Sequence, residues 1–192
     1  NRLKDFLSIG VNRLSLGFQS FDDNLLSFLG RLHSSKDCIK TYENARKAGF
    51  GNINADLIFD IPGQTIECWK QDLKTLAELE PEHISTYSLT VEKQTNLFKL
   101  VQAGRVTMPS ETLDISMYTH SLDFLKQKKY LQYEISNHSK EDYTCKHNLH
   151  YWKNDPYISF GPSAHSYDMK KRWWNINNLT QYSKSIKNNE PP

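Results

Sequence analysis

Two polar residues, Gln19 and Asp56, stand where apolar sequence would present them to a ligand. Gln19 ends a short apolar segment, and its amide offers both a donor and an acceptor to the hydroxyl or carboxylate groups of a polar ligand. Asp56 lies inside the apolar segment 53–59, where a carboxylate is costly unless it is paired or faces a site. Two alternatives stay open: Gln19 satisfies backbone groups of a loop, and Asp56 forms a buried ion pair with Arg31 or Arg46.

The segment from His147 to Trp152 combines two histidines with aromatic residues. Imidazole nitrogens can ligate iron axially, and neighbouring aromatic rings can line a flat macrocycle. Further on, the small-residue loop 161–166 lets the backbone approach a ligand closely. Both segments also have a purely structural interpretation, as a structural histidine and as an ordinary turn between strands.

A turn at residues 62–65 leads into an amphipathic helix, with Thr65 as the expected N-cap. Three backbone amides at the start of that helix could bind an anion, whereas turn and capping chemistry is the simpler interpretation. The sequence contains no catalytic-triad order, zinc quartet or Walker A loop. Residue chemistry by itself therefore predicts a ligand-binding β/α domain and no specific reaction.

Alternating strands and helices must position these residues in the first half of the chain. The expected elements are strands at 14–18, 53–59 and 83–89, a helix from Ser34 or Ser35 to Gly49, and a helix over Ile66, Trp69, Leu73 and Leu76. This order predicts an α/β fold with parallel strands and right-handed crossovers, either an open doubly wound sheet or part of a β/α barrel. In both, ligands bind beyond the carboxyl ends of the strands, here at Gln19, 59–63 and 90–92.

The pattern changes after Thr95, so we predict one domain over 1–95 and an accessory region over 96–192. Helices are expected at 96–103, 109–129 and 179–187, with Ile115, Tyr118, Leu122 and Leu125 forming the apolar stripe of the long one. Aromatic-rich pieces are expected to form strands and turns, at 130–136, 147–152, 157–160 and 173–174.

The composition limits the classes of function. The 192 residues carry 24 basic and 22 acidic side chains, which is too balanced to predict a nucleic-acid partner. No apolar run approaches the ~18 residues of a membrane span, and the 3 cysteines show no disulfide spacing, so we expect a cytoplasmic protein. Because the chain opens at Asn1, already inside an apparent helix that ends at Gly10, we expect it to be an internal piece of a longer protein.

Taken together, several ordered strings resemble the radical-SAM oxygen-independent coproporphyrinogen III oxidase-like family over nearly the whole chain. The strings are GVNRLSLGFQSF at 10–21, LGRLH at 29–33, NADLI at 54–58, PGQT at 62–65, YSLTVE at 87–92, QYEISN at 132–137, HNLHYW at 147–152 and FGPSAHSY at 160–167. The last three resemble the haem-chaperone branch of the family more than the true oxidase branch.

The resemblance implies the later strands of a partial (β/α)₆ barrel, followed by an α+β accessory region that is incomplete at its C-terminus. It also implies a [4Fe-4S] cluster, S-adenosylmethionine (SAM) and haem as cofactors. In that family a Cys-x₃-Cys-x₂-Cys motif holds the cluster, and we expect this motif upstream of Asn1. Reduction of the cluster cleaves SAM to a deoxyadenosyl radical, which in the oxidase branch starts the decarboxylation of coproporphyrinogen. Because the cluster cysteines are absent from this chain, radical chemistry does not follow from the chain itself.

The resemblance also assigns binding residues position by position. Gln19, Arg31 and Asp56 match residues that hold SAM, with Asp56 serving a ribose hydroxyl or amine and Arg31 the carboxylate. Thr90 and His165 align with weaker cofactor-contact positions. We expect Gln19, Arg31 and Asp56 to converge at one mouth of the strand layer.

His147 matches the histidine of the His-Asn-x-x-Tyr-Trp motif in the chaperone branch, which makes it the expected haem ligand. The chain departs from the family pattern at two places. Asp60 and Ile61 replace the usual Gly-Leu before Pro62, and Ser163 replaces a common glycine. These departures put only local loop geometry in doubt.

The sequence therefore predicts a protein that binds haem and SAM and delivers haem to an acceptor protein, with an electron donor for the cluster as a further partner. A first alternative is the true oxidase, which acts on a porphyrinogen. A second is a β/α ligand-binding module without radical chemistry. No nucleic acid and no membrane span are expected.

Overall fold

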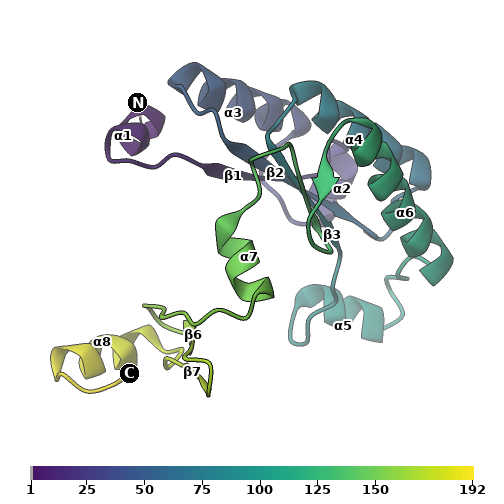
Figure 1. Cartoon of the computed structure of the whole chain (residues 1–192). Helices are drawn as coiled ribbons and strands as arrows, with labels where there is room; N and C mark the ends of the chain where they lie inside the picture. The colour runs from purple at the N-terminus through teal and green to yellow at the C-terminus, as the bar shows by residue number, and fades with distance from the viewer. Residues whose placement is uncertain (1) are drawn as a thin grey trace. The chain divides into compact units, whose positions relative to one another are not determined.

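The computed structural model describes residues 2–192, and the chain divides into two compact units between Thr144 and Cys145 (Figure 1). The first unit holds α1 to β5, and the second holds α7 to α8. In chain order the elements are α1 (Arg2–Ser8), β1 (Leu14–Gln19), α2 (Asp23–Phe28), α3 (Ser35–Ala48), β2 (Ile53–Phe59), α4 (Ile66–Leu79), β3 (His83–Ser88), α5 (Asn96–Gln102), α6 (Glu111–Gln127), β4 (Leu131–Gln132), β5 (Asn137–Ser139), α7 (Lys146–Trp152), β6 (His165–Tyr167), β7 (Arg172–Trp174) and α8 (Leu179–Lys187).

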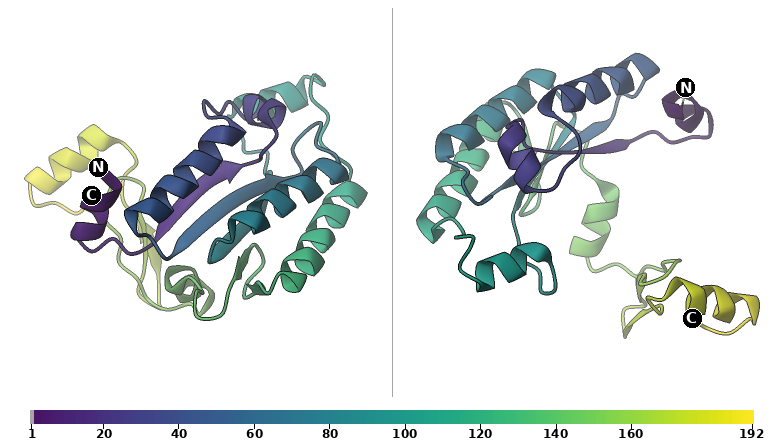
Figure 2. Two further views of the ribbon diagram at one scale, coloured as in Figure 1. Left: turned by 90° about the horizontal axis from the view of Figure 1, so that it is seen from above. Right: turned by 180° about the vertical axis from the view of Figure 1, so that it is seen from behind.

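A five-stranded sheet with the order β1-β2-β3-β5-β4 forms the centre of the first unit. β1, β2 and β3 pair in parallel, whereas β5 runs antiparallel to both β3 and β4. Parallel neighbours need crossover connections, which α3 and α4 supply. In the view from above, α3, α4 and α6 run alongside the strands (Figure 2). The predicted α/β fold, with parallel strands in the first half of the chain, is confirmed.

The two faces of β2 differ because successive side chains of a strand point to opposite sides. Ile53, Ala55, Leu57 and Phe59 join the hydrophobic core, together with buried residues of α3, α4 and α6. The intervening Asn54 and Asp56 belong to the opposite face, which we call the inner face of the sheet. The helices therefore cover an apolar outer face, and polar side chains are left to the inner face.

The caps that the sequence predicts for α3 and α4 are confirmed. Ser34 caps α3 in a capping box with Asp37, and Gly49 ends it with φ at 111°, a left-handed conformation that suits glycine. Thr65 caps α4 by accepting a hydrogen bond from the Cys68 N–H. The turn at 62–65 therefore caps α4, as the simpler interpretation of the sequence predicts.

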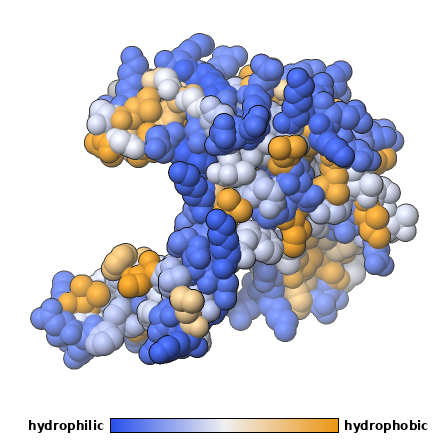
Figure 3. All heavy atoms as spheres, in the orientation of Figure 1, coloured by the Kyte–Doolittle hydropathy of each residue, from blue (hydrophilic) through white to orange (hydrophobic). Residues whose placement is uncertain are grey.

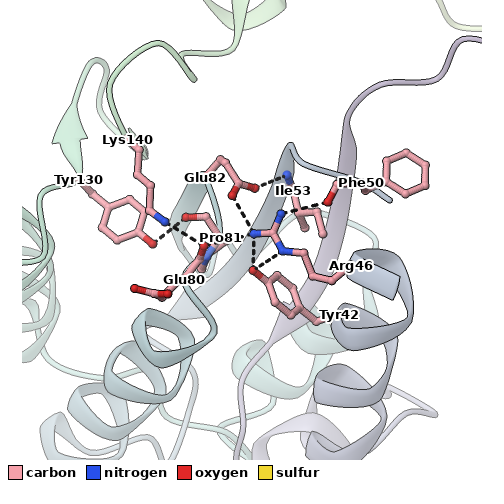
Figure 4. A network of polar contacts seen from close by, with 9 residues as sticks. All are labelled: Tyr42, Arg46, Phe50, Ile53, Glu80, Pro81, Glu82, Tyr130 and Lys140. Carbon is pink, nitrogen blue, oxygen red and sulfur yellow. Dashed lines mark hydrogen bonds and ion pairs between the residues drawn. The ribbon is translucent and has the colours of Figure 1, made fainter. Parts of the chain in front are cut away.

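An ion pair between Arg46 and Glu82 joins α3 to the start of β3 (Figure 4). The Arg46 guanidinium lies 2.8 Å from the Glu82 carboxylate and donates to the Tyr42 hydroxyl at 2.9 Å. Glu82 also accepts a 2.9 Å hydrogen bond from the Ile53 N–H. The alternative of an ion pair between Arg46 and Asp56 is therefore wrong, since the guanidinium pairs with Glu82.

The later elements match the sequence less closely. α6 buries Met117, Ser121 and Leu125, at i, i+4 and i+8, whereas Ile115 is 56% exposed, so the predicted stripe is wrong at its first position. Residues 147–152 form most of helix α7 and not strands and turns, so that prediction is also wrong. Over 130–136 the strand is only Leu131–Gln132.

The second unit consists of α7, the hairpin of β6 and β7, and α8. Helix 179–187 and the strand at Trp173 and Trp174 are confirmed. Several apolar side chains stay exposed, and apolar patches are visible on this part of the surface (Figure 3). The two compact units divide after Thr144, and the pairing of β5 with β3 places β5 in the first unit. The predicted boundary after Thr95, between a barrel and an accessory region, stays a prediction. Within residues 2–192, no helix is long and apolar enough to cross a membrane.

Candidate functional site

The inner face of the sheet gathers polar residues from neighbouring strands. The strand register places Ser15 beside Asn54 and Gly17 beside Asp56 in the β1–β2 pair. In the β2–β3 pair it places Asn54 beside His83 and Asp56 beside Ser85, and β5 adds Asn137 beside Ser85. Polar residues at matching positions of four strands are atypical of a sheet core, so this face is the first candidate for a ligand site.

Gln19 folds back over β1 onto this face. Its backbone is left-handed, with φ at 71°, and the register to β2 shifts between Gly17 and Gln19. A Cβ atom at Gly17 would lie 2.6 Å from the Gln19 Nε2 atom, so the glycine leaves room for the amide in this position. Because Gly17 pairs with Asp56, the Gln19 amide lies beside the strand position of Asp56.

Asp56 is half-buried and is held by two neutral donors. Its Oδ1 atom accepts from Asn54 Nδ2 at 2.6 Å, and its Oδ2 atom accepts from Ser15 Oγ at 3.3 Å. A carboxylate has about four acceptor positions, so these contacts leave capacity for a ligand. The alternative of a buried ion pair is wrong: within the described residues neither Arg31 nor Arg46 pairs with Asp56.

The loop that follows Gln19 is fixed by a residue that the sequence analysis did not identify. Asp72 of α4, 2% exposed, accepts from Ser20 Oγ at 2.7 Å and from the Phe21 N–H at 2.8 Å. Burial raises the pKa of the Asp72 carboxyl to about 6, although these hydrogen bonds favour the charged form. The sequence signal was an acidic residue inside the apolar stripe of a helix, next to Leu73.

Two other predicted site residues lie in exposed connections. Arg31 follows α2, and Thr90 follows β3; both side chains are exposed. The structure thus brings together Gln19 and Asp56 of the predicted residues. The convergence of Arg31 with them stays a prediction, as does the role of Thr90.

The cysteines of the described chain do not fit an iron–sulfur cluster. Burial raises the pKa of the Cys38 thiol to about 11 and that of the Cys68 thiol to about 12, which disfavours the thiolate needed by a metal. Cys145 is buried as well. Residues 2–192 contain no group of three or more His, Cys, Asp or Glu residues that could hold a metal ion.

The second unit carries a row of aromatic rings next to His147. The exposed His147 ring meets Tyr151 edge-on, with centroids 5.0 Å apart, and Tyr151 meets Tyr157 at 4.7 Å. His150, by contrast, lies 3.0 Å from the Asp155 carboxylate. An exposed imidazole beside exposed aromatic side chains fits an axial ligand for a flat metallomacrocycle.

His165 lies on the hairpin of the same unit. Its ring lies over Trp174 with centroids 5.7 Å apart, and both residues line a pocket that also includes Ser163 and Asn175. His165 is therefore available for a ligand within its own unit. Its assignment to the site of Gln19 and Asp56 stays a prediction.

Comparisons with known proteins agree with these features. The model of the family described as "Radical SAM superfamily" matches residues 1–76. The chain is 41% identical over 181 residues to a "Heme chaperone HemW" of Bacillus subtilis, covering 94% of this chain and 48% of that protein. It is 40% identical over 164 residues to "Radical S-adenosyl methionine domain-containing protein 1, mitochondrial" of Danio rerio, covering 85% of this chain and 37% of that protein.

Among solved structures, coproporphyrinogen III oxidase (HemN) from Escherichia coli matches with a TM-score of 0.80. The superposition covers 99% of this chain and 46% of the oxidase, at 22% sequence identity, so it shows a shared fold. The chain thus spans about half the length, or less, of the proteins it matches.

Proposed function

This chain carries part of a radical SAM domain and is homologous to the HemW haem chaperones, and from that premise we propose that it belongs to a protein that binds haem and S-adenosylmethionine and delivers haem to acceptor proteins. The observation that carries this proposal is the similarity to HemW relatives over most of the chain, including both candidate sites. A haem-accepting protein, an electron donor for the cluster and a cytoplasmic location belong to the same proposal.

The first candidate site is proposed to hold SAM. Gln19 and Asp56 share the inner face, and the unused acceptor positions of Asp56 suit a ligand group with hydroxyl or ammonium donors. Arg31, Thr90 and His165 are proposed to complete this site. The cluster, when bound, supplies the electron that cleaves SAM, and its ligands are proposed to lie outside the described residues.

The second candidate site is proposed to hold haem. His147 would supply an axial imidazole, and Tyr151 would supply part of an aromatic wall. Burial of a macrocycle against such side chains is favourable by roughly 25 cal/mol per Å² of apolar surface. The oxidase alternative rests on a shared fold and is left as an outcome of the test below.

The test is a pair of titrations on the full-length protein, with haem followed by its Soret absorbance and SAM followed by calorimetry. We expect His147→Ala to weaken haem binding roughly tenfold or more and to leave SAM binding unchanged. We expect His165→Ala to weaken SAM binding. His120→Ala, which changes a histidine of α6 outside both sites, should alter neither.

Two results would contradict the proposal. If His147→Ala binds haem as tightly as wild type, the ligand is assigned to the wrong residue. If wild type binds no haem and instead decarboxylates coproporphyrinogen, the oxidase alternative is correct.

A further inference from the structure

A chain of hydrogen bonds runs from Asp56 across the inner face of the sheet, from β2 to β3. Asn54 Nδ2 donates to Asp56 Oδ1 at 2.6 Å, and Asn54 Oδ1 lies 2.6 Å from His83 Nδ1. His83 Nε2 lies 2.7 Å from the Tyr133 hydroxyl. These bonds link β2, β3 and the segment between β4 and β5. His83 is 29 positions from Asn54 and 50 positions from Tyr133 in the sequence.

The direction of every bond in this chain follows from the carboxylate at its end. An ionised carboxylate only accepts, so the Asn54 atom that faces Asp56 must be the NH₂ group. The Asn54 carbonyl oxygen then faces His83, and the Nδ1 atom of His83 must donate. In a neutral ring, His83 Nε2 is then an acceptor, and the Tyr133 hydroxyl donates to it. A neutral His83 is therefore in its Nδ1–H tautomer.

The surroundings of His83 favour this single state. The side chain is fully buried, at 0% exposure, and the Tyr133 ring meets it edge-on with centroids 5.5 Å apart. Burial, and then the nearby charge of Arg13, lower the pKa of His83 to about 3, so the ring stays neutral at physiological pH. Ser85 Oγ lies 3.1 Å from the same Asn54 oxygen and 2.6 Å from Asn137 Oδ1.

We propose that His83 is a positioning residue for Asp56. By donating to the Asn54 carbonyl, His83 fixes the orientation of that amide, and the amide in turn holds one carboxylate oxygen and leaves the rest of Asp56 for the ligand. Without this donor, the Asn54 oxygen keeps only the longer bond from Ser85 Oγ, at 3.1 Å, and a flipped amide would present its oxygen to the carboxylate, which would repel it. This inference rests on the proposed binding of SAM at Asp56.

The tautomer is tested directly in the 192-residue chain labelled with ¹⁵N at histidine. Long-range ¹H–¹⁵N correlation distinguishes a protonated from an unprotonated ring nitrogen, and the His83 signals are assigned by their loss in His83→Gln. We expect a protonated Nδ1 and an unprotonated Nε2. A protonated Nε2 with an unprotonated Nδ1 would overturn the proposal.

The effect on the site is tested by SAM affinity in the full-length protein with its cluster. His83→Phe should weaken binding roughly tenfold, because it removes the shortest bond that holds the Asn54 oxygen away from the Asp56 carboxylate. Tyr133→Phe is the gentler variant, which keeps the imidazole and removes only its outer donor, and should weaken binding roughly threefold.

Tyr130→Phe is the matched control for a purely structural effect. The Tyr130 hydroxyl donates an equally short bond, 2.7 Å to the Pro81 carbonyl, and Tyr130 is more deeply buried than Tyr133, but it belongs to the outer face. Tyr130→Phe should lose at least as much stability as Tyr133→Phe, and only Tyr133→Phe should lose affinity.

Asp56→Asn separates this inference from the proposed function. If wild type does not bind SAM, or Asp56→Asn binds it as tightly as wild type, the proposed site is wrong and the inference falls with it. If Asp56→Asn loses binding while folded His83→Phe and Tyr133→Phe bind like wild type, the site stands and the positioning role of His83 is overturned. Equal losses of affinity in Tyr130→Phe and Tyr133→Phe would also overturn it.

Discussion

The two units of this chain treat their apolar side chains in opposite ways. The first unit buries a continuous core of aliphatic and aromatic residues between the sheet and its helices. Among the described residues of the second unit, Cys145 is the one apolar residue that is buried. There, Phe160 is 87% exposed, Ile158 72% and Trp174 65%.

This difference shows where each unit obtains its stability. Removal of apolar surface from water is the main favourable term in folding, so the first unit has a driving force of its own. The second unit covers residues 145–192, a length at which a chain buries little apolar surface and is at most marginally stable alone. Its exposed aromatic side chains remain available for a ligand or a partner, as the proposed haem site requires.

The strongest test of this contrast replaces one tryptophan in each unit. Trp69 is fully buried, and its Nε1–H donates to the Met117 carbonyl at 3.0 Å and lies 2.9 Å from Ser121 Oγ. Trp69→Ala should lower the free energy of unfolding by about 4 kcal/mol, because it leaves a large cavity in the core. Urea denaturation followed by far-UV circular dichroism measures the change.

Trp174→Ala serves as the matched substitution in the second unit. Because its side chain is largely exposed, the same measurement should change by less than about 0.5 kcal/mol. A loss from Trp174→Ala as large as that from Trp69→Ala would mean that the exposed aromatic residues also support the fold, and the contrast would fail.

A second test uses a buried histidine, His138 of β5. His138 is 1% exposed, and neither of its ring nitrogens has a hydrogen-bond partner within residues 2–192. Burial lowers the pKa of His138 to about 4, from 6.5 when exposed. The unfolded chain therefore binds more protons between these values, and stability falls as the pH drops from 6.5 to about 4.

His138→Phe removes this group and its titration. We expect the variant to be more stable than wild type at pH 7 by about 1–2 kcal/mol, because an unsatisfied buried polar group is lost. Its advantage should grow by on the order of 3 kcal/mol towards pH 4. Thermal unfolding across this pH range measures both the gain in stability at pH 7 and its growth towards pH 4. A difference between His138→Phe and wild type that stays constant across this range would contradict the prediction.

The fold of the first unit was predictable because its signals are local. Apolar runs, the caps at Ser34 and Thr65 and the glycine at Gly49 all lie within or next to the elements they define. Residues 147–152 were predicted wrongly because aromatic residues also favour strands, and a seven-residue helix is too short to show a clear period.

The candidate site was predictable only where the sequence itself marks it. Gln19 and Asp56 stand out as polar residues at or inside apolar strands. Asp72 and His83 did not, since their roles depend on partners brought together by folding: Ser20 is 52 positions from Asp72, and Tyr133 is 50 from His83. Periodicity assigns a residue to a face of its own element and does not identify its partner on another.

The smallest expected effect concerns two positions at which the chain departs from the family it resembles, one in each unit. Asp60 has φ at 63° and Ser163 has φ at 59°, and both stand where the family pattern has glycine. A left-handed conformation strains a side chain other than glycine. Asp60 bears an additional cost, because its Oδ1 atom is buried without a hydrogen-bond partner among residues 2–192. Burial, together with the charge of Asp114, also raises the pKa of its carboxyl to about 6.

Asp60→Gly should therefore stabilise the first unit by about 1 kcal/mol at pH 7, as the relieved strain and charge exceed the flexibility that glycine adds to the unfolded chain. Since the folded carboxyl takes up its proton near pH 6 and the unfolded one near 3.8, wild type regains stability as the pH falls between them, and the gain should shrink.

Asp60→Asn tolerates the same backbone and removes only the charge, so its gain should disappear in acid while part of the glycine gain persists. Ser163→Gly lacks the buried carboxylate and should show no dependence on pH. Urea denaturation at pH 7 and pH 4 separates these cases, and a destabilised Asp60→Gly would show that the Asp60 side chain makes a favourable contact that outweighs its strain.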